Sequence, residues 1–85
     1  MNDTEILDLI KQALLEVAPE READFNDVSL EATIEDLDLD SVSTMEMVGF
    51  LEEQVDKIFP EEELAKVQRL GDLAALMQGN RVNAA

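Results

Sequence analysis

The chain has 85 residues, 46% of them hydrophobic, and its 6 Lys and Arg against 21 Asp and Glu give a formal net charge of −15. This length leaves room for one small domain. The acidity argues against a nucleic-acid-binding protein, because neutralising phosphates needs clustered Lys and Arg. The sequence contains no Cys and no His, which excludes a disulfide framework, a zinc–cysteine site and a hydrolytic triad with an imidazole base.

The first predicted element is a helix over residues 4–17. Asn2 and Glu5 have the spacing of a capping box at its start, and Pro19 ends the segment. The apolar residues of this segment recur at intervals of three and four, as on one face of an amphipathic helix. They are Ile6, Leu7, Ile10, Leu14 and Val17.

Residues 18–40 form a long acidic connection in which single apolar residues are spaced apart. A structureless loop of this length is unusual in a compact domain, so we expect it to pack on the core through its apolar side chains or to serve a function. We also expect a short turn near Leu30–Ile34. The apolar residues of the connection are Phe25, Val28, Leu30, Ile34, Leu37 and Leu39.

A second strong helix is predicted over residues 41–56, followed by Pro60. Asp40 is a suitable N-cap, but Ser43 with Glu46 forms a competing capping box that would start the helix three residues later. A short helix is expected over residues 61–66.

A last helix is predicted over residues 72–78, after a break at Leu70–Gly71 and with Leu73, Leu76 and Met77 facing inward. Residues 79–85 show no periodicity and are expected to be a mobile tail. The predicted fold is an all-α bundle of three main helices plus one short helix. A long loop separates the first two helices, and the domain spans residues 1–78.

The start of the chain lacks the basic residues and apolar stretch of a signal peptide. No run approaches the roughly 18 apolar residues that a membrane span needs. We therefore expect a cytoplasmic protein without a membrane span.

The helix at 41–56 has two apolar sides. At roughly 100° per residue, one side carries Met47, Val48, Leu51 and Val55, the expected core stripe. The opposite side carries Val42, Met45 and Gly49 beside Glu46, Glu53 and Asp56. This second strip is either a docking surface for a basic partner with an apolar pocket, or ordinary core covered by the long loop. The periodicity does not distinguish the two.

Asp36, Asp38 and Asp40 alternate along the chain, as ligands do in a calcium loop of the EF-hand type. The register fails, however, because Ser41 stands where the loop needs Gly and Met47 where it needs Glu. We expect only weak, nonspecific binding of divalent cations, and no dedicated metal site.

Ser41 has two interpretations. Serine is favoured at helix starts as an ordinary cap. A hydroxyl at a helix N-terminus could also carry a phosphate group, which would meet free backbone N–H groups and the positive end of the helix dipole. A catalytic role is disfavoured, because a nucleophilic serine needs a base and the nearest lysine is Lys57.

The segment Leu37-Asp38-Leu39-Asp40-Ser41-Val42, followed by Met45-Glu46-Met47 and Leu51-Glu52-Glu53, resembles the signature of acyl carrier proteins. The resemblance implies that Ser41 carries a 4′-phosphopantetheine arm, attached from coenzyme A by a phosphopantetheinyl transferase. The thiol of the arm would hold acyl groups as thioesters for fatty-acid, polyketide or related biosynthesis. The chain itself would be a monomeric carrier and not an enzyme.

The resemblance also assigns a partner-binding face on the same helix. It would contact the transferase and the acyl-transferring and condensing enzymes, through their basic docking surfaces. The residues of this face are Asp40, Val42, Met45, Glu46, Glu53 and Asp56.

Four positions depart from the family pattern. Asp38 replaces the usual Gly, Val42 replaces Leu, and Gly49–Phe50 replaces a large aliphatic residue followed by a small one. These changes leave the attachment of the arm credible and make a dedicated carrier of a specialised pathway an option. The absence of a Gly-Gly-His/Asp-Ser pattern favours acyl over aminoacyl cargo. Two other classes stay open, namely an acidic helical interaction module without a prosthetic group and a small calcium-responsive protein.

Overall fold

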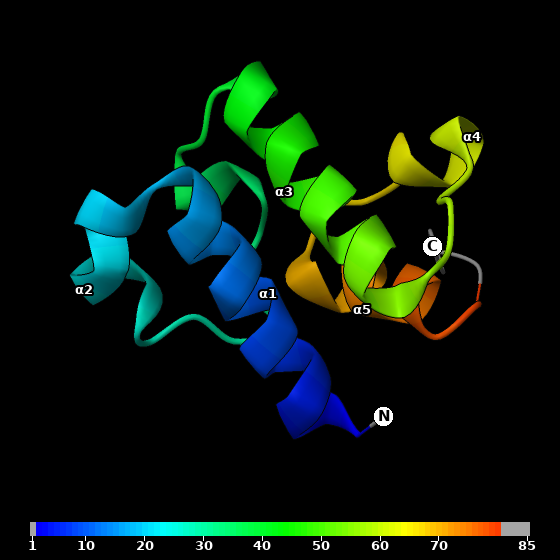
Figure 1. The fold of residues 1–85 in the computed structure, drawn as a ribbon, viewed down its shortest axis with the longest axis horizontal. Helices are drawn as coiled ribbons and strands as arrows, with labels where there is room; N and C mark the ends of the chain where they lie inside the picture. The colour runs from blue at the N-terminus through cyan, green and yellow to red at the C-terminus, as the bar shows by residue number, and fades with distance from the viewer. Residues whose placement is uncertain (1, 81–85) are drawn as a thin grey trace.

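The computed structural model describes residues 2–80 and is helical (Figure 1). Its helices are α1 (Asp3–Val17), α2 (Glu22–Phe25), α3 (Ser41–Val55), α4 (Glu61–Leu64) and α5 (Leu70–Met77), with 3-10 turns η1 (Pro19–Arg21) and η2 (Glu35–Leu37). The prediction of an all-α fold with three main helices is confirmed. The prediction of one short helix is incomplete, because α2 lies inside the connection that we expected to be a loop.

Helix α1 begins at Asp3, one residue before the predicted start, and has the predicted capping box. The Asn2 side chain accepts a hydrogen bond from the Glu5 N–H over 2.9 Å, and the Glu5 carboxylate accepts one from the Asn2 N–H over 3.3 Å. This reciprocal capping box satisfies two N–H groups that a helix start would otherwise leave unpaired. The apolar face of α1 is then buried against the rest of the bundle, with Ile6 and Ile10 at 0% exposure.

Helices α1 and α3 lie side by side and run in opposite directions, and both contact α5 (Figure 1). The core forms where these three helices meet. Beyond Ile6 and Ile10, its buried residues are Ala13, Leu14, Ala18, Phe25, Leu37, Met47, Leu51, Phe59, Leu70, Leu73, Ala74, Leu76 and Met77. The predicted inward positions of the last helix, Leu73, Leu76 and Met77, are therefore confirmed.

The long connection between α1 and α3 packs on this core, as predicted. Phe25 and Leu37 are buried, and the other apolar residues of the connection are half-buried against the core. The expected turn is present, closed by a hydrogen bond from the Ala32 N–H to the Ser29 carbonyl over 3.0 Å. Burial of these side chains fixes the course of the connection between its short helical pieces η1, α2 and η2.

Backbone hydrogen bonds also tie the connection to the start of α5. The Ile34 N–H donates to the Gln68 carbonyl over 2.8 Å, the Leu70 N–H to Ala32 over 2.9 Å, and the Gly71 N–H to the Leu30 carbonyl over 2.7 Å. A Cβ atom added at Gly71 would lie 3.1 Å from that same Leu30 oxygen. Glycine at this position therefore allows the two backbones to approach closely.

The predicted bounds of the three later helices also need correction. Helix α3 ends at Val55, because Asp56 adopts a left-handed C-cap conformation with φ 54°. Helix α4 ends at Leu64, before the predicted end at residue 66.

The third correction concerns α5, which begins at Leu70 and ends at Met77, so the predicted break at Gly71 is wrong. The Asp72 carboxylate explains the early start. It accepts hydrogen bonds from the Gln68 and Arg69 N–H groups over 2.9 and 3.1 Å and so caps this end of α5. Of the predicted tail, residues 81–85 lie outside the described residues. Across residues 2–80, the helices are too short or too polar to cross a membrane.

Candidate functional site

Ser41 is the first residue of α3, directly after the N-cap Asp40. The Asp40 backbone is extended, with φ −75° and ψ 173°, and its Oδ1 accepts a hydrogen bond from the Ser43 N–H over 2.7 Å. This geometry is that of an N-cap side chain satisfying the third N–H of its helix. The structure thus selects Asp40 as the cap over the competing Ser43–Glu46 box.

The capping bond also fixes the charge of Asp40. The Ser43 N–H, followed by the Ser43 hydroxyl and the Val42 N–H, holds the pKa of the Asp40 carboxyl below its ordinary value of 3.8. Hydrogen bonds donated to the ionised form stabilise that form. Asp40 is therefore a carboxylate at neutral pH, and its charge is directed at the N-terminus of α3.

The Ser41 side chain is exposed, and within residues 2–80 its hydroxyl has no hydrogen-bond partner. Asp40 does the capping, so Ser41 is not needed for it. The interpretation of Ser41 as an ordinary cap is therefore wrong. An exposed hydroxyl at a helix start, without a competing bond, is a side chain that a modifying enzyme can reach.

Arg21 holds the approach to this site in place. Its Nη1 donates to the Asp38 carbonyl over 3.2 Å, its Nε pairs with Asp24 at 3.1 Å, and its guanidinium lies 5.1 Å from the centre of the Phe25 ring. Asp38 has a left-handed backbone with φ 52°. The chain thus turns at Asp38 and enters α3 three residues later, at Ser41. No local pattern predicts the Arg21–Asp38 contact, because it joins residues far apart in the chain.

The exposed face of α3 comprises Val42, Met45, Glu46, Glu53 and Asp56, all of them exposed. Val42 and Met45 are 66% and 74% exposed, so the interpretation that the long loop covers them is wrong. The opposite side forms the core stripe, as predicted. Met47 and Leu51 are buried, and Val48 and Val55 are half-buried.

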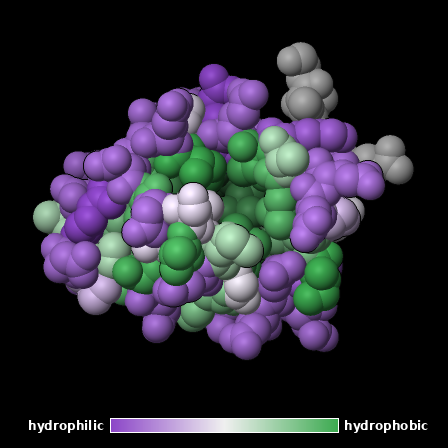
Figure 2. Space-filling view, turned by 90° about the horizontal axis from the view of Figure 1, so that it is seen from above, coloured by the Kyte–Doolittle hydropathy of each residue, from purple (hydrophilic) through white to green (hydrophobic). Residues whose placement is uncertain are grey.

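An apolar hollow of about 270 Å³ opens beside α3. Figure 2, which views the molecule from the side of α4 and the α3 N-terminus, shows a hollow lined by hydrophobic side chains and rimmed by hydrophilic ones. Met45 contributes both to this lining and to the exposed face. The other lining residues are Ile34, Thr44, Met47, Val48, Glu52, Leu64, Val67 and Leu73. The hollow could not be predicted from the sequence, because it forms only when α3, the connection and the α4 region come together.

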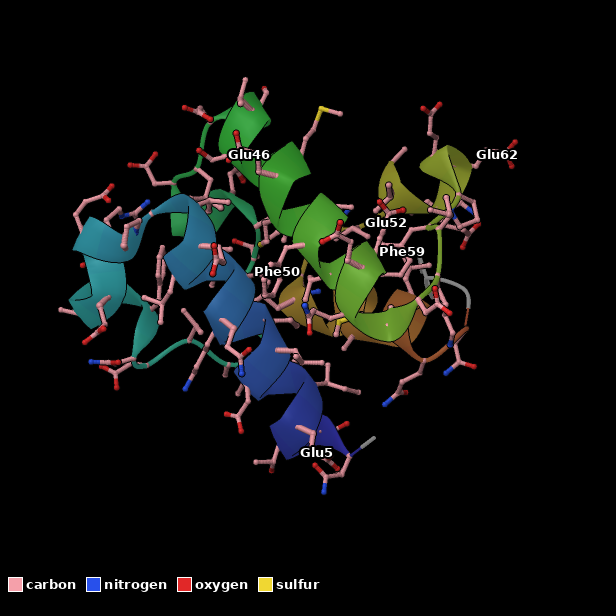
Figure 3. The ribbon with its side chains drawn as sticks, in the orientation of Figure 1. Glu5, Glu46, Phe50, Glu52, Phe59 and Glu62 are labelled. Atoms are coloured by element: carbon pink, nitrogen blue, oxygen red, sulfur yellow. The ribbon has the colours of Figure 1, made fainter. Side chains whose placement is uncertain are left out.

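Glu52 fixes the chain that follows α3. Its Oε2 accepts a hydrogen bond from the Phe59 N–H over 2.7 Å, and both side chains are labelled in Figure 3. Phe59 is buried in the core. The Glu52 carboxylate therefore holds the chain after α3 in place, a role that could not be predicted from the sequence.

The alternating aspartates do not gather into a site. In the part of the chain that the structure describes, no three acidic side chains are grouped so that they could hold a metal ion. The Asp36 carboxylate instead accepts from the Thr33 N–H over 3.4 Å, and Asp40 caps α3.

Comparison with known proteins agrees with this arrangement. The family model described as "Phosphopantetheine attachment site" matches residues 5–77, which include Ser41 and all of α3. An acyl carrier protein of Helicobacter hepaticus is 32% identical over 76 residues, covering 88% of this chain and 100% of the relative. An acyl carrier protein homolog of Ureaplasma parvum serovar 3 is 31% identical over 64 residues, covering 75% and 83%.

No solved structure matches the chain significantly. The family match extends over most of the chain, and the relative from Helicobacter hepaticus is covered from end to end. The chain therefore belongs to the acyl carrier protein family.

Proposed function

We propose that the Ser41 hydroxyl is the attachment point of a 4′-phosphopantetheine group transferred from coenzyme A. The observation that carries the proposal is the exposed, unbonded hydroxyl at the first residue of α3, in a chain matched by a phosphopantetheine-attachment family. The residues present suit the group. The Ser41 oxygen can accept a phosphate there, and the N-terminus of α3 favours negative charge beside it.

The bound group supplies a thiol that holds acyl cargo as a thioester. The protein's own residues would present this thiol and shelter the cargo. Met47, Val48 and Leu64 line the apolar hollow beside α3 and would offer an acyl chain a surface away from water. The chain contains no Cys and no His, so the reactions on the cargo would fall to partner enzymes.

These partners would bind the exposed face of α3 together with Asp40. Exposed Val42 and Met45 beside Glu46, Glu53 and Asp56 suit an apolar pocket surrounded by basic residues. Methionine is suited to several partners, because its side chain is flexible. We expect the phosphopantetheinyl transferase and acyl-transferring and condensing enzymes to bind here, in a cytoplasmic fatty-acid, polyketide or related pathway, with the carrier as a monomer.

The test is intact-protein mass spectrometry before and after incubation with coenzyme A, Mg²⁺ and a broad-specificity phosphopantetheinyl transferase. We expect the wild-type protein to gain the mass of one phosphopantetheine group and the Ser41→Ala variant to gain none. Ser43→Ala is the matched control, because Ser43 lies on the same turn but its N–H is engaged by Asp40. Uptake should survive in that control.

Loading that persists in Ser41→Ala would disprove the assignment of the site. If the folded wild-type protein takes up nothing from a competent transferase, the chain is better described as an acidic interaction module without a prosthetic group.

A further inference from the structure

The turn that leads into α3 has a strained backbone. Asp38 ends η2 with φ 52° and ψ 44°, a left-handed conformation that residues other than glycine adopt only at an energetic cost. Such a conformation persists where the surrounding contacts determine it. Ser41 follows three residues later as the first residue of α3, so the path of this turn sets where the Ser41 hydroxyl lies.

A single long-range hydrogen bond holds this turn. The Asp38 N–H donates to the Glu35 carbonyl over 3.1 Å, which is a local contact within η2 and its cap. The hydrogen bonds of Asp40 stay within the first turn of α3. In the part of the chain that the structure describes, residues 38–40 are tied to elements before η2 by the hydrogen bond that the Arg21 Nη1 donates to the Asp38 carbonyl, over 3.2 Å.

Arg21 is itself oriented by two other groups. Its Nε pairs with Asp24 over 3.1 Å, and its guanidinium lies 5.1 Å from the centre of the buried Phe25 ring. The ion pair by itself should contribute little to stability, because the Asp24 side chain is 62% exposed. Its effect is to fix the guanidinium so that Nη1 faces Asp38. A lysine has one ammonium group in place of the planar fork and could not make these contacts together.

We infer that Arg21 is a positioning residue for the loading of Ser41. This inference rests on the proposed function. Arg21 makes no hydrogen bond to the Ser41 hydroxyl. It acts through the Asp38 carbonyl, because this bond keeps the turn, and with it the Asp40 cap, in the conformation that presents the hydroxyl to the transferase.

Loss of the Arg21 bond should raise KM for the carrier and leave kcat unchanged. Without the bond, the turn would adopt its present conformation for only a fraction of the time. The apparent affinity of the transferase falls by that fraction, so a fraction of about one fifth raises KM about fivefold. Leu39 stays packed against the core, so the turn loosens while α3 itself remains.

The sign of the change in KM separates positioning from charge. Loss of Arg21 makes the formal net charge of −15 one unit more negative, which should strengthen binding to a basic transferase and lower KM. Positioning requires KM to rise instead. Lys66→Met is the matched control for charge, because Lys66 forms the same kind of i,i+3 ion pair, with Glu63.

The first test measures kcat and KM for the carrier in the loading reaction. Arg21→Met should raise KM about fivefold, whereas Lys66→Met should leave KM at or below its wild-type value. Arg21→Lys keeps the charge but loses the fork, and it should raise KM about threefold. This variant carries the test if Arg21→Met does not fold. Ile10→Val removes a methyl group from the core of α1 and lowers stability, yet it should load with wild-type KM.

The second test is amide hydrogen exchange, which needs no transferase. The N–H groups of Ser43 and Thr44 bond to the Asp40 side chain and carbonyl, so they report whether the start of α3 is held. They should exchange faster in Arg21→Met than in Ile10→Val, because the first variant opens the turn locally. A merely structural role of Arg21 would give the two variants the same exchange at these amides.

The inference is overturned if KM of Arg21→Met stays within about twofold of KM of Lys66→Met. It is overturned equally if Ile10→Val raises KM as much as Arg21→Met, or if the exchange at the start of α3 is the same in both. Any of these results beside normal loading of the wild-type protein rejects the role of Arg21 and retains Ser41. A wild-type protein that takes up nothing rejects Ser41 as the site and this inference with it.

Discussion

Helices α1 and α3 have the same length, 15 residues each, and lie against one another (Figure 1), yet their sequences serve different ends. Helix α1 has one apolar face, which is buried at Ile6, Ile10, Ala13 and Leu14. Helix α3 fully buries only Met47 and Leu51. It leaves Val42 and Met45 exposed and contains a glycine at its centre.

The difference between the two helices separates residues that are needed for folding from residues that are not. The stripe and capping box of α1 are what a helix in a small bundle needs. In α3, the exposed residues Val42 and Met45 should contribute little to stability, and a Cβ atom built at Gly49 meets no neighbouring atom within 4 Å. We propose that these residues serve contact with other molecules.

The largest expected effect contrasts a core residue of α1 with an exposed residue of α3. Ile10→Ala removes a side chain at 0% exposure and should lower the free energy of unfolding by about 2–5 kcal/mol. Met45→Ala removes a side chain that is 74% exposed and should change it by less than about 0.5 kcal/mol. Urea unfolding of both variants measures this, and equal losses would contradict the division between the two helices.

Charge reversal should weaken partner binding when it is made on the exposed face of α3 but not when it is made on α1. Glu46→Lys/Glu53→Lys should weaken binding to a basic partner, the phosphopantetheinyl transferase, by about tenfold or more. The matched control is Asp8→Lys/Glu16→Lys on the exposed side of α1, which changes the net charge equally. Calorimetric titration at two salt concentrations compares them. If both double variants bind equally weakly, net charge and not the α3 face controls the association.

Much of α1 could be predicted from sequence, because its cap and its apolar stripe are local patterns. The N-cap Asp40 and the core stripe of α3 were found for the same reason. What could not be predicted depends on distant contacts. The Gly71 N–H reaches the Leu30 carbonyl, so a glycine that resembles a helix breaker lies inside α5.

The candidate site also combines features that local sequence predicts with features that depend on distant contacts. Ser41 was identified from its neighbours in sequence and from the family resemblance, and its exposure follows from the capping by Asp40. Whether Val42 and Met45 are covered depends on the path of residues 18–40, which periodicity does not determine. The hollow beside α3 requires side chains from several elements, so no local pattern predicts it.

The two helices also differ in how the chain enters them. Helix α3 follows Asp38, whose φ of 52° is left-handed, and this conformation costs a non-glycine residue about 1–2 kcal/mol. Asp38→Gly should therefore stabilise the protein by about 0.5–1 kcal/mol, since glycine also loses more entropy on folding. A left-handed backbone at this position would also account for the Gly that the family pattern usually has there. Urea unfolding checks it, and destabilisation would mean that the Asp38 side chain holds the turn.

The smallest expected effect is a pH dependence of stability that distinguishes the two N-caps, Asn2 and Asp40. Only Asp40 ionises. Its folded-state pKa lies below the ordinary value of 3.8, so its stabilising contribution is complete above pH 3.8 and is lost as the pH falls through the lowered value. Asp40→Asn keeps a capping oxygen but removes the ionisation. The free energy of unfolding should therefore favour the wild-type protein at pH 6, and this advantage should shrink at pH 3.

The wild-type protein and Asp40→Asn are compared at the same pH. The other carboxylates are protonated alike in both, so their contribution to the difference in free energy of unfolding cancels. The advantage should be modest, because Asp40 is exposed and water screens its charge. Asn2→Asp transfers the ionisable cap to α1 and should create the same pH-dependent difference there. An advantage of wild type over Asp40→Asn that is equal at pH 6 and pH 3 would show that the cap acts through its geometry alone, and the charge of Asp40 would then be free to serve partner binding.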